Sequence, residues 1–169
     1  MDKFIIKIIT SQLIVYILRC LIGFTIGYNL MIRLPQYELF WSLLSIILVI
    51  SPEGKDSRRL TIERVKSNFI GSIVGLLCVL ISPDENVTVI IFGIIITSLI
   101  CHLFKVMNMA RVAIVALLII LLQPHFSEIK LTPILRFSSV AIGCLIGLTI
   151  TICTSMIIRK IKNKYGIPY

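Results

Sequence analysis

Three arginines in strongly apolar surroundings are the residues of this 169-residue chain that could do chemistry. Arg19 lies near the middle of the first apolar segment, Arg64 lies just before the third, and Arg136 lies at the start of the sixth. A guanidinium group stays charged and offers a planar fork of donors that fits a carboxylate. The three side chains are therefore candidate ligands for a small organic anion.

Two of these arginines belong to a repeated pattern. Residues 64–75 read RVKSNFIGSIVG and residues 136–147 read RFSSVAIGCLIG, with glycines seven and eleven positions after each arginine. At about 100° per residue, an arginine and glycines at this spacing share one helix face. GxxxG is a packing motif of membrane helices, which predicts close contact with a neighbouring helix. The glycines concerned are Gly71, Gly75, Gly143 and Gly147.

Arg19 has no acidic residue deep in any predicted helix to pair with. A charge at this depth is costly, so such a side chain usually faces the bundle interior, a water-filled cavity or a partner. The alternative is that its long apolar stem lets the charge reach the membrane boundary. Gly23 and Gly27 follow in the sequence GFTIG and predict a further close-packing face.

The second and fifth apolar segments are short, and each ends at a proline. They read LFWSLLSIILVISP, ending at Pro52, and VAIVALLIILLQP, ending at Pro124. Short or interrupted segments at matching positions in two halves of a transporter mark its binding site. Trp41 is therefore a candidate substrate contact, with a membrane-interface tryptophan as the alternative.

These residues must be positioned by membrane helices. The chain is 57% hydrophobic and 15% charged, whereas soluble domains carry about a quarter charged residues. Segments of about 20 apolar residues cross a bilayer. We expect an all-α membrane protein with six transmembrane helices, at about 8–32, 35–51, 67–82, 87–104, 107–123 and 134–158.

Lysine and arginine positions predict the orientation of this bundle. If the N-terminus is cytosolic, thirteen of the basic residues fall on the inner side and three on the outer side, with Arg19 in the membrane. Cytosolic loops are enriched in such residues. Both termini are therefore predicted inside, with a basic cytosolic tail at residues 159–169. Arg64 falls on the cytosolic side, where this rule explains it without a function, whereas Arg136 falls on the outer side, against the rule.

The offset of 72 residues between Arg64 and Arg136 also relates Pro52 to Pro124. The predicted units are two three-helix repeats, at about 1–82 and 87–158, in one membrane module. An odd number of spans inverts the second copy, as in many transporters. The sequence thus predicts an inverted repeat.

The chemistry of an enzyme or a metal centre is not expected. The five cysteines lie inside apolar segments without a CxxC pair or a histidine at ligand spacing. They fit small buried apolar residues. No Ser/His/Asp, His/Glu or Cys/His constellation has the spacing that catalysis needs. We expect no catalytic residues, no metal, no cofactor and no nucleic-acid partner.

Residues 39–77, LFWSLLSIILVISPEGKDSRRLTIERVKSNFIGSIVGLL, resemble the signature of the fusaric acid resistance protein-like (FUSC) family of the aromatic acid exporter superfamily. In that family a tryptophan begins an apolar helix that ends at a proline, a polar cytosolic loop follows, and an arginine precedes a helix with two glycines. Residues 109–123, MARVAIVALLIILLQ, resemble its alanine-rich fifth helix. The resemblance covers about residues 37–158.

The resemblance implies a multi-pass inner or plasma membrane protein that exports aromatic carboxylic acids and related amphipathic anions. Larger members of the family carry two six-helix modules and cytosolic domains, so a single module implies a homodimer surrounded by membrane lipids. The leading hypothesis is a secondary transporter subunit, with proton coupling as the default because no ATP motif is present. The alternative is a non-transporting scaffold or accessory subunit, which needs only the packing glycines and the basic cytosolic face.

Overall fold

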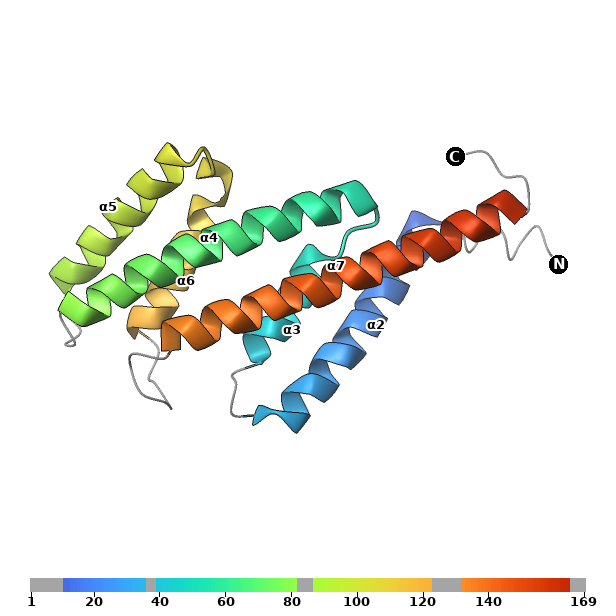
Figure 1. The fold of residues 1–169 in the computed structure, drawn as a ribbon, viewed down its shortest axis with the longest axis horizontal. Helices are drawn as coiled ribbons and strands as arrows, with labels where there is room; N and C mark the ends of the chain where they lie inside the picture. Colours follow the sequence, from blue (N-terminus) through green and yellow to red (C-terminus); the bar gives the residue numbers. More distant parts are fainter. Residues whose placement is uncertain (1–10, 36–38, 82–86, 123–131, 165–169) are drawn as a thin grey trace. The chain divides into compact units, whose positions relative to one another are not determined.

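The computed structural model describes residues 11–35, 39–81, 87–122 and 132–164. Pro124 and Lys130 lie outside these residues. The described chain is helical and contains no strand, so the all-α prediction is confirmed. Its elements (Figure 1) are α2 (Gln12–Arg33), α3 (Phe40–Val49), α4 (Gly54–Ile81), α5 (Val87–Leu103), the 3-10 turn η2 (Met107–Met109), α6 (Ala110–Leu122) and α7 (Thr132–Lys164).

Three of the helices are long and apolar enough to cross a membrane, judged by length and composition. They are α2, α4 and the part of α7 from Pro133 to Asn163. The other apolar helices are shorter. At 1.5 Å per residue, the 10-residue helix α3 is about 15 Å long, against a hydrocarbon core of about 30 Å. The expected crossing by all six apolar segments therefore stays a prediction.

The surface of α2 fits contact with lipid. Its buried residues are Arg19, Gly23 and Gly27, spaced four apart along one stripe. Large apolar side chains cover most of its remaining surface, with Leu13 67% exposed and Leu21 59% exposed. An apolar surface of this extent is unusual on a protein in water and marks a surface that contacts a membrane or another protein.

The helices α4 and α7 extend beyond their apolar segments. The polar stretch after Pro52 was expected to be a loop, but α4 begins at Gly54. That expectation is wrong because the stretch GKDSRRLTIER is rich in good helix formers and has Asp56 in its first turn, where a carboxylate complements the helix dipole. The polar residues form about three turns ahead of the apolar part. Likewise, α7 continues through the basic residues to Lys164.

The helices form two compact units that do not coincide with the two halves of the sequence. Unit 1 comprises residues 1–61 and 142–169, and its described part holds α2, α3, the start of α4 and most of α7. Unit 2 comprises residues 62–141 and holds most of α4, all of α5 and α6, and the start of α7. Each unit therefore contains segments from both predicted repeats.

In unit 1, α7 packs on α3 through the glycines of the second repeated pattern. A Cβ atom added to Gly143 would lie 2.8 Å from the Cα of Ser42, and one added to Gly147 would lie 2.9 Å from the carbonyl oxygen of Ile46. Gly23 of α2 also faces Ile46, whose Cγ2 would be 2.8 Å from such a Cβ. Helix α3 is thus packed against glycines of two helices.

In unit 2, α4 packs on α6 through the glycines of the first pattern. A Cβ atom added to Gly71 would meet the backbone carbonyl of Ala113 and lie 2.9 Å from the Cβ of Ala116. One added to Gly75 would lie 3.1 Å from side-chain atoms of Ile120. In each unit, then, a long helix contacts a short helix that comes from the other half of the sequence.

Candidate functional site

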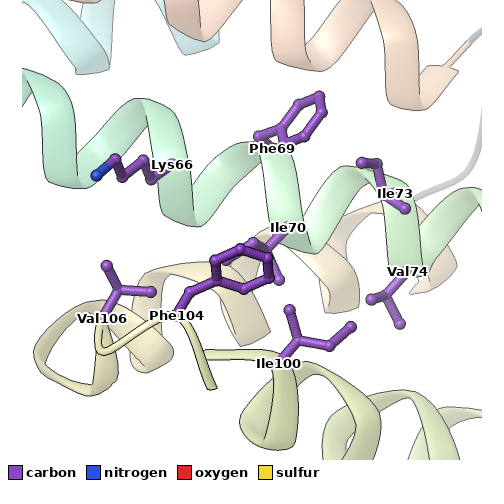
Figure 2. A pocket seen from close by; sticks show the side chains of 8 residues that line it. All are labelled: Lys66, Phe69, Ile70, Ile73, Val74, Ile100, Phe104 and Val106. Carbon is purple, nitrogen blue, oxygen red and sulfur yellow. The ribbon is translucent and has the colours of Figure 1, made fainter. Parts of the chain in front are cut away.

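An apolar groove in unit 2 lies between α4 and the end of α5. Its volume is about 420 Å³. Its walls are Lys66, Phe69, Ile70, Ile73 and Val74 of α4, with Ile100, Phe104 and Val106 on the opposite side (Figure 2). We call this hollow the unit 2 groove.

The wall formed by α4 follows from helical spacing. Its residues recur at intervals of three and four, which places them on one face of the helix. Val74 is 1% exposed and packs in a core cluster with Leu117 and Cys78, so this end of the groove rests on the core of unit 2. Phe69 is 50% exposed and forms part of the rim, where it packs against Phe137 with ring centroids 5.3 Å apart.

The opposite wall depends on how α5 ends. The Val106 N–H donates to the Cys101 carbonyl at 2.9 Å, and the Lys105 N–H donates to the His102 carbonyl at 3.1 Å. Lys105 has a φ of 55°, in the left-handed region. Together these features make a Schellman motif, in which a left-handed residue reverses the chain at a helix end. The reversal places Phe104 and Val106 beside α4.

The groove combines one positive charge with an apolar interior. Lys66 lies at the end opposite Ile73 and Val74, and Phe69 and Phe104 contribute aromatic rings (Figure 2). The described residues that line the groove include no other charged side chain. Binding sites for small molecules have this composition and a volume of about 300 Å³ or more. The groove is thus suited to a ligand with an apolar, aromatic body and a single anionic group.

Arg19 is the centre of a polar junction in unit 1. The side chain is 2% exposed. Its Nη1 donates to the carbonyls of Ser51 and Pro52, the latter at 2.9 Å. Its Nε donates to Thr154 Oγ1 and its Nη2 to Ser155 Oγ, both at 2.8 Å. The guanidinium therefore links α2, the segment just after α3, and α7.

The junction holds the chain segment that follows α3. Proline interrupts the chain there and cannot donate a backbone hydrogen bond, and a positive charge near the last carbonyls is favoured by the helix dipole. The Ser51 N–H donates to Ser57 Oγ at 3.0 Å, and Ser57 Oγ donates to Thr151 Oγ1 at 3.3 Å. These hydroxyl residues were not singled out from the sequence, although Thr151, Thr154 and Ser155 have helical spacing within an apolar segment.

The other predicted site residues are divided between the units. Trp41 is partly buried in unit 1, with its ring edge-on to Phe40 at a centroid distance of 5.6 Å. Arg64 is partly buried on α4, and Arg136 is 4% exposed on α7, both in unit 2. Arg19 and Trp41 thus belong to one unit and Arg64 and Arg136 to the other.

Lys66 and its groove were missed at the sequence level, where this lysine counted only toward the cytosolic charge. A signal was present, because Lys66, Phe69, Ile70 and Ile73 place one cation and an aromatic ring on a single helix face. The contribution of Phe104 and Val106 could not be seen, since it depends on the chain reversal at Lys105.

The comparisons with known proteins agree with the resemblance in the sequence. The family model for fusaric acid resistance protein-like proteins matches residues 20–150. No significant match was found among curated proteins or solved structures. The matched region covers more than half of the chain, including both glycine patterns and all residues of the unit 2 groove. The chain therefore belongs to the fusaric acid resistance protein-like (FUSC) family, whose function is related to membrane transport.

Proposed function

We propose that the chain is a subunit of a plasma-membrane transporter that exports amphipathic organic acids, in particular aromatic carboxylic acids. The observation that carries this proposal is the unit 2 groove, with one ammonium group at the end of an apolar hollow that has two phenylalanine rings. Family membership supports a role in transport. The lining of the groove supports an amphipathic anion as the chemical class of the substrate.

The complementarity can be stated group by group. A carboxylate next to Lys66 would keep its charge compensated as water leaves, whereas an unpaired charge in an apolar hollow is costly. An aromatic body could pack against Phe69 and Phe104 in offset or edge-to-face geometry, which favours binding beyond simple burial. A neutral molecule would leave the ammonium without a counter-ion. A single negative charge is therefore the best match.

The direction of transport follows from the proposed topology. With the N-terminus inside and six crossings, the polar start of α4 and the turn between α5 and α6 lie on the cytosolic side, where positive residues concentrate. Lys66 comes two residues after the polar start of α4, and Phe104 is the first residue after α5. The groove would then receive substrate from the cytosol, as export requires. The short helices α3 and α6 at matching positions support a transporter with an inverted repeat, and a second copy in a homodimer would supply the second module.

Transport can be measured with the purified protein in liposomes, using a panel of labelled aromatic acids and a pH gradient. Lys66→Met should raise the KM for these acids about tenfold, equivalent to about 1.4 kcal/mol of binding. Lys66→Arg should retain most of the affinity. Lys160→Met is the matched control, because Lys160 is an exposed lysine of α7 outside the groove. If the folded wild-type protein moves no acid of the panel, the scaffold hypothesis replaces the transporter.

The aromatic wall gives a second variant with a close control. Phe104 is 71% exposed and lines the groove, whereas its neighbour Leu103 is 70% exposed and does not. Phe104→Ala should weaken transport of aromatic acids more than that of aliphatic acids, and Leu103→Ala should change neither. Equal effects of the two substitutions would show that the groove is not the substrate site.

The topology is tested separately by cysteine accessibility in a background without native cysteines. A cysteine at Lys55 should react with an impermeant reagent only from the cytosolic side, and a cysteine at Lys130 only from outside. Labelling of both positions from one side would contradict the proposed orientation.

A further inference from the structure

Unit 1 contains a basic cleft that the transport proposal does not use. The cleft consists of two adjoining hollows, of about 340 Å³ and about 280 Å³, which share Ser155 and Arg159 of α7. Lys55 and Arg58, at the start of α4, line the first hollow. Arg19 and Lys162 line the second. The cleft lies where the polar start of α4 meets the basic end of α7.

The lining of the cleft is strongly positive. Of its described residues, five are lysines or arginines and none is acidic. Lys55 and Arg58 are exposed and Lys162 is partly buried, so their charged groups can reach a ligand in the hollows. Several cations around one space favour a ligand with more than one anionic oxygen, and a phosphate group is such a ligand.

Arg19 adds a fixed charge at the side of the cleft. Its described hydrogen-bond partners are two carbonyls and two hydroxyls, none of which carries a negative charge. Its charge is therefore not neutralised by these partners. Ser155 Oγ accepts from Arg19 and lines both hollows, so the hydroxyl hydrogen of Ser155 can be donated to a ligand there.

Apolar side chains alternate with these cations. Ile152 and Met156 line the first hollow, and Val15 and Ile158 line the second. Met156 is 54% exposed and next to Ile157, which is 57% exposed, on a helix long and apolar enough to cross a membrane. A ligand in the cleft therefore meets positive charge and a lipid-facing apolar surface together. A soluble phosphate would use only the first of these.

We propose that the basic cleft binds the phosphate of an anionic phospholipid headgroup. Lys55, Arg58 and Lys162 contact the phosphate oxygens, Ser155 donates a hydrogen bond, and the acyl chains lie along Val15 and Ile158. Basic residues near a bilayer surface are attracted to anionic lipid in this way. The site is independent of the unit 2 groove and does not require the chain to transport any substrate.

The test compares lipids and soluble anions on the purified full-length chain. Thermal unfolding is followed in nanodiscs of phosphatidylcholine alone and of phosphatidylcholine with a minor fraction of phosphatidylglycerol, and retained lipid is identified by native mass spectrometry. Phosphatidylglycerol should be retained and should raise the unfolding temperature. Inorganic phosphate should neither raise it nor displace the lipid. Equal stabilisation by inorganic phosphate would overturn the assignment to a lipid.

The variant Lys55→Gln/Arg58→Gln tests the cleft itself. These side chains are exposed, and an unfolding temperature in phosphatidylcholine close to that of the wild type checks that the variant folds. The variant should bind phosphatidylglycerol at least about tenfold more weakly. The matched control, Lys105→Gln/Lys160→Gln, removes the same charge at exposed positions outside the cleft and outside the unit 2 groove, and it should bind normally. Equal weakening in both variants would overturn the proposal, because it would show attraction to total charge and not to a site.

Discussion

In unit 1 the chain just after the short helix α3 is held by a side chain from another helix, whereas in unit 2 the chain just after α5 is held by hydrogen bonds to its own helix. Arg19 crosses from α2 to the carbonyls of Ser51 and Pro52. At the end of α5, the N–H groups of Lys105 and Val106 donate instead to the His102 and Cys101 carbonyls in the last turn of that helix. In unit 1, polar side chains fill the space beside this segment. In unit 2, the backbone hydrogen bonds leave the side chains of Phe104 and Val106 to line the groove.

The same glycine pattern serves both units, so the difference lies in what surrounds it. Gly143 allows α7 to pack closely on α3, and Gly71 allows α4 to pack closely on α6. The unit 2 groove lies within the region that matches the family model, residues 20–150, whereas Arg19, Thr154 and Ser155 lie just beyond its ends. The glycine contacts and the groove therefore lie inside the region that matches the family model. Most of the side chains in the Arg19 junction lie outside that region.

Arg19→Met should have the largest effect on stability. It removes four hydrogen bonds and leaves two backbone carbonyls without their described donor. Leaving a buried polar group unsatisfied costs about 1–3 kcal/mol, so we expect a loss of about 3 kcal/mol or more in the free energy of unfolding. Thermal and denaturant unfolding in detergent measures it.

Arg19→Lys sharpens the same comparison. Lysine keeps the charge but lacks the planar fork that reaches four acceptors, so we expect a loss intermediate between the wild type and Arg19→Met. If Arg19→Met is as stable as the wild type, the junction does not hold the end of α3.

Gly143→Ala and Gly71→Ala should have the next largest effect. Each should lower the free energy of unfolding by about 2 kcal/mol, because the new methyl group would meet the backbone of a neighbouring helix. Gly75→Ala is the matched control. Its methyl group would meet only the side chain of Ile120 at 3.1 Å, which can shift. Unfolding temperatures of the three variants measure the effect. A loss confined to Gly143→Ala would show that the two units do not depend on glycine packing equally.

Hydropathy and spacing predicted much of this architecture. Each described helix overlaps one of the six apolar segments, and α3 ends before Pro52 as the pattern indicates, whereas Pro124 lies outside the described residues. The arginine and glycine spacing places these residues on one face, but it does not reveal which helix they contact. That contact depends on tertiary structure, because each long helix packs on a short helix from the other half of the sequence, and local sequence does not encode this pairing.

The parts that could not be predicted depend on tertiary contacts or on polar helix formers. Hydropathy stops at the charged residues, so it missed the turns of α4 from Gly54 onward. The partners of Arg19 are mainly carbonyls and hydroxyls, whose positions are set by the end of α3 and by α7. An isolated arginine in an apolar segment indicates an unusual site. The pattern does not distinguish an arginine that bonds to backbone carbonyls and hydroxyls from one that binds an anion.

Ser57→Ala tests the smaller part of the junction. It removes the acceptor of the Ser51 N–H and the bond to Thr151, so we expect a loss of about 1 kcal/mol. Ser138→Ala is the control, because the hydroxyl of Ser138 is bonded only within its own helix, to the Ile134 carbonyl, among the described contacts. Hydrogen exchange of the Ser51 amide should increase in Ser57→Ala alone. Unchanged exchange would show that this hydroxyl does not protect the end of α3.

Lys105→Gly should have the smallest effect, and it should be stabilising. Lys105 has a φ of 55°, a conformation that costs a residue with a Cβ about 1–2 kcal/mol and glycine almost nothing. Glycine loses more entropy on folding, which offsets part of this gain. We therefore expect Lys105→Gly to raise the free energy of unfolding by about 0.5–1 kcal/mol. Lys105→Ala removes the same charge but keeps the Cβ, and it should not stabilise. If alanine stabilises the protein as much as glycine does, then the charge of Lys105, and not its left-handed backbone conformation, lowers the stability of the end of α5.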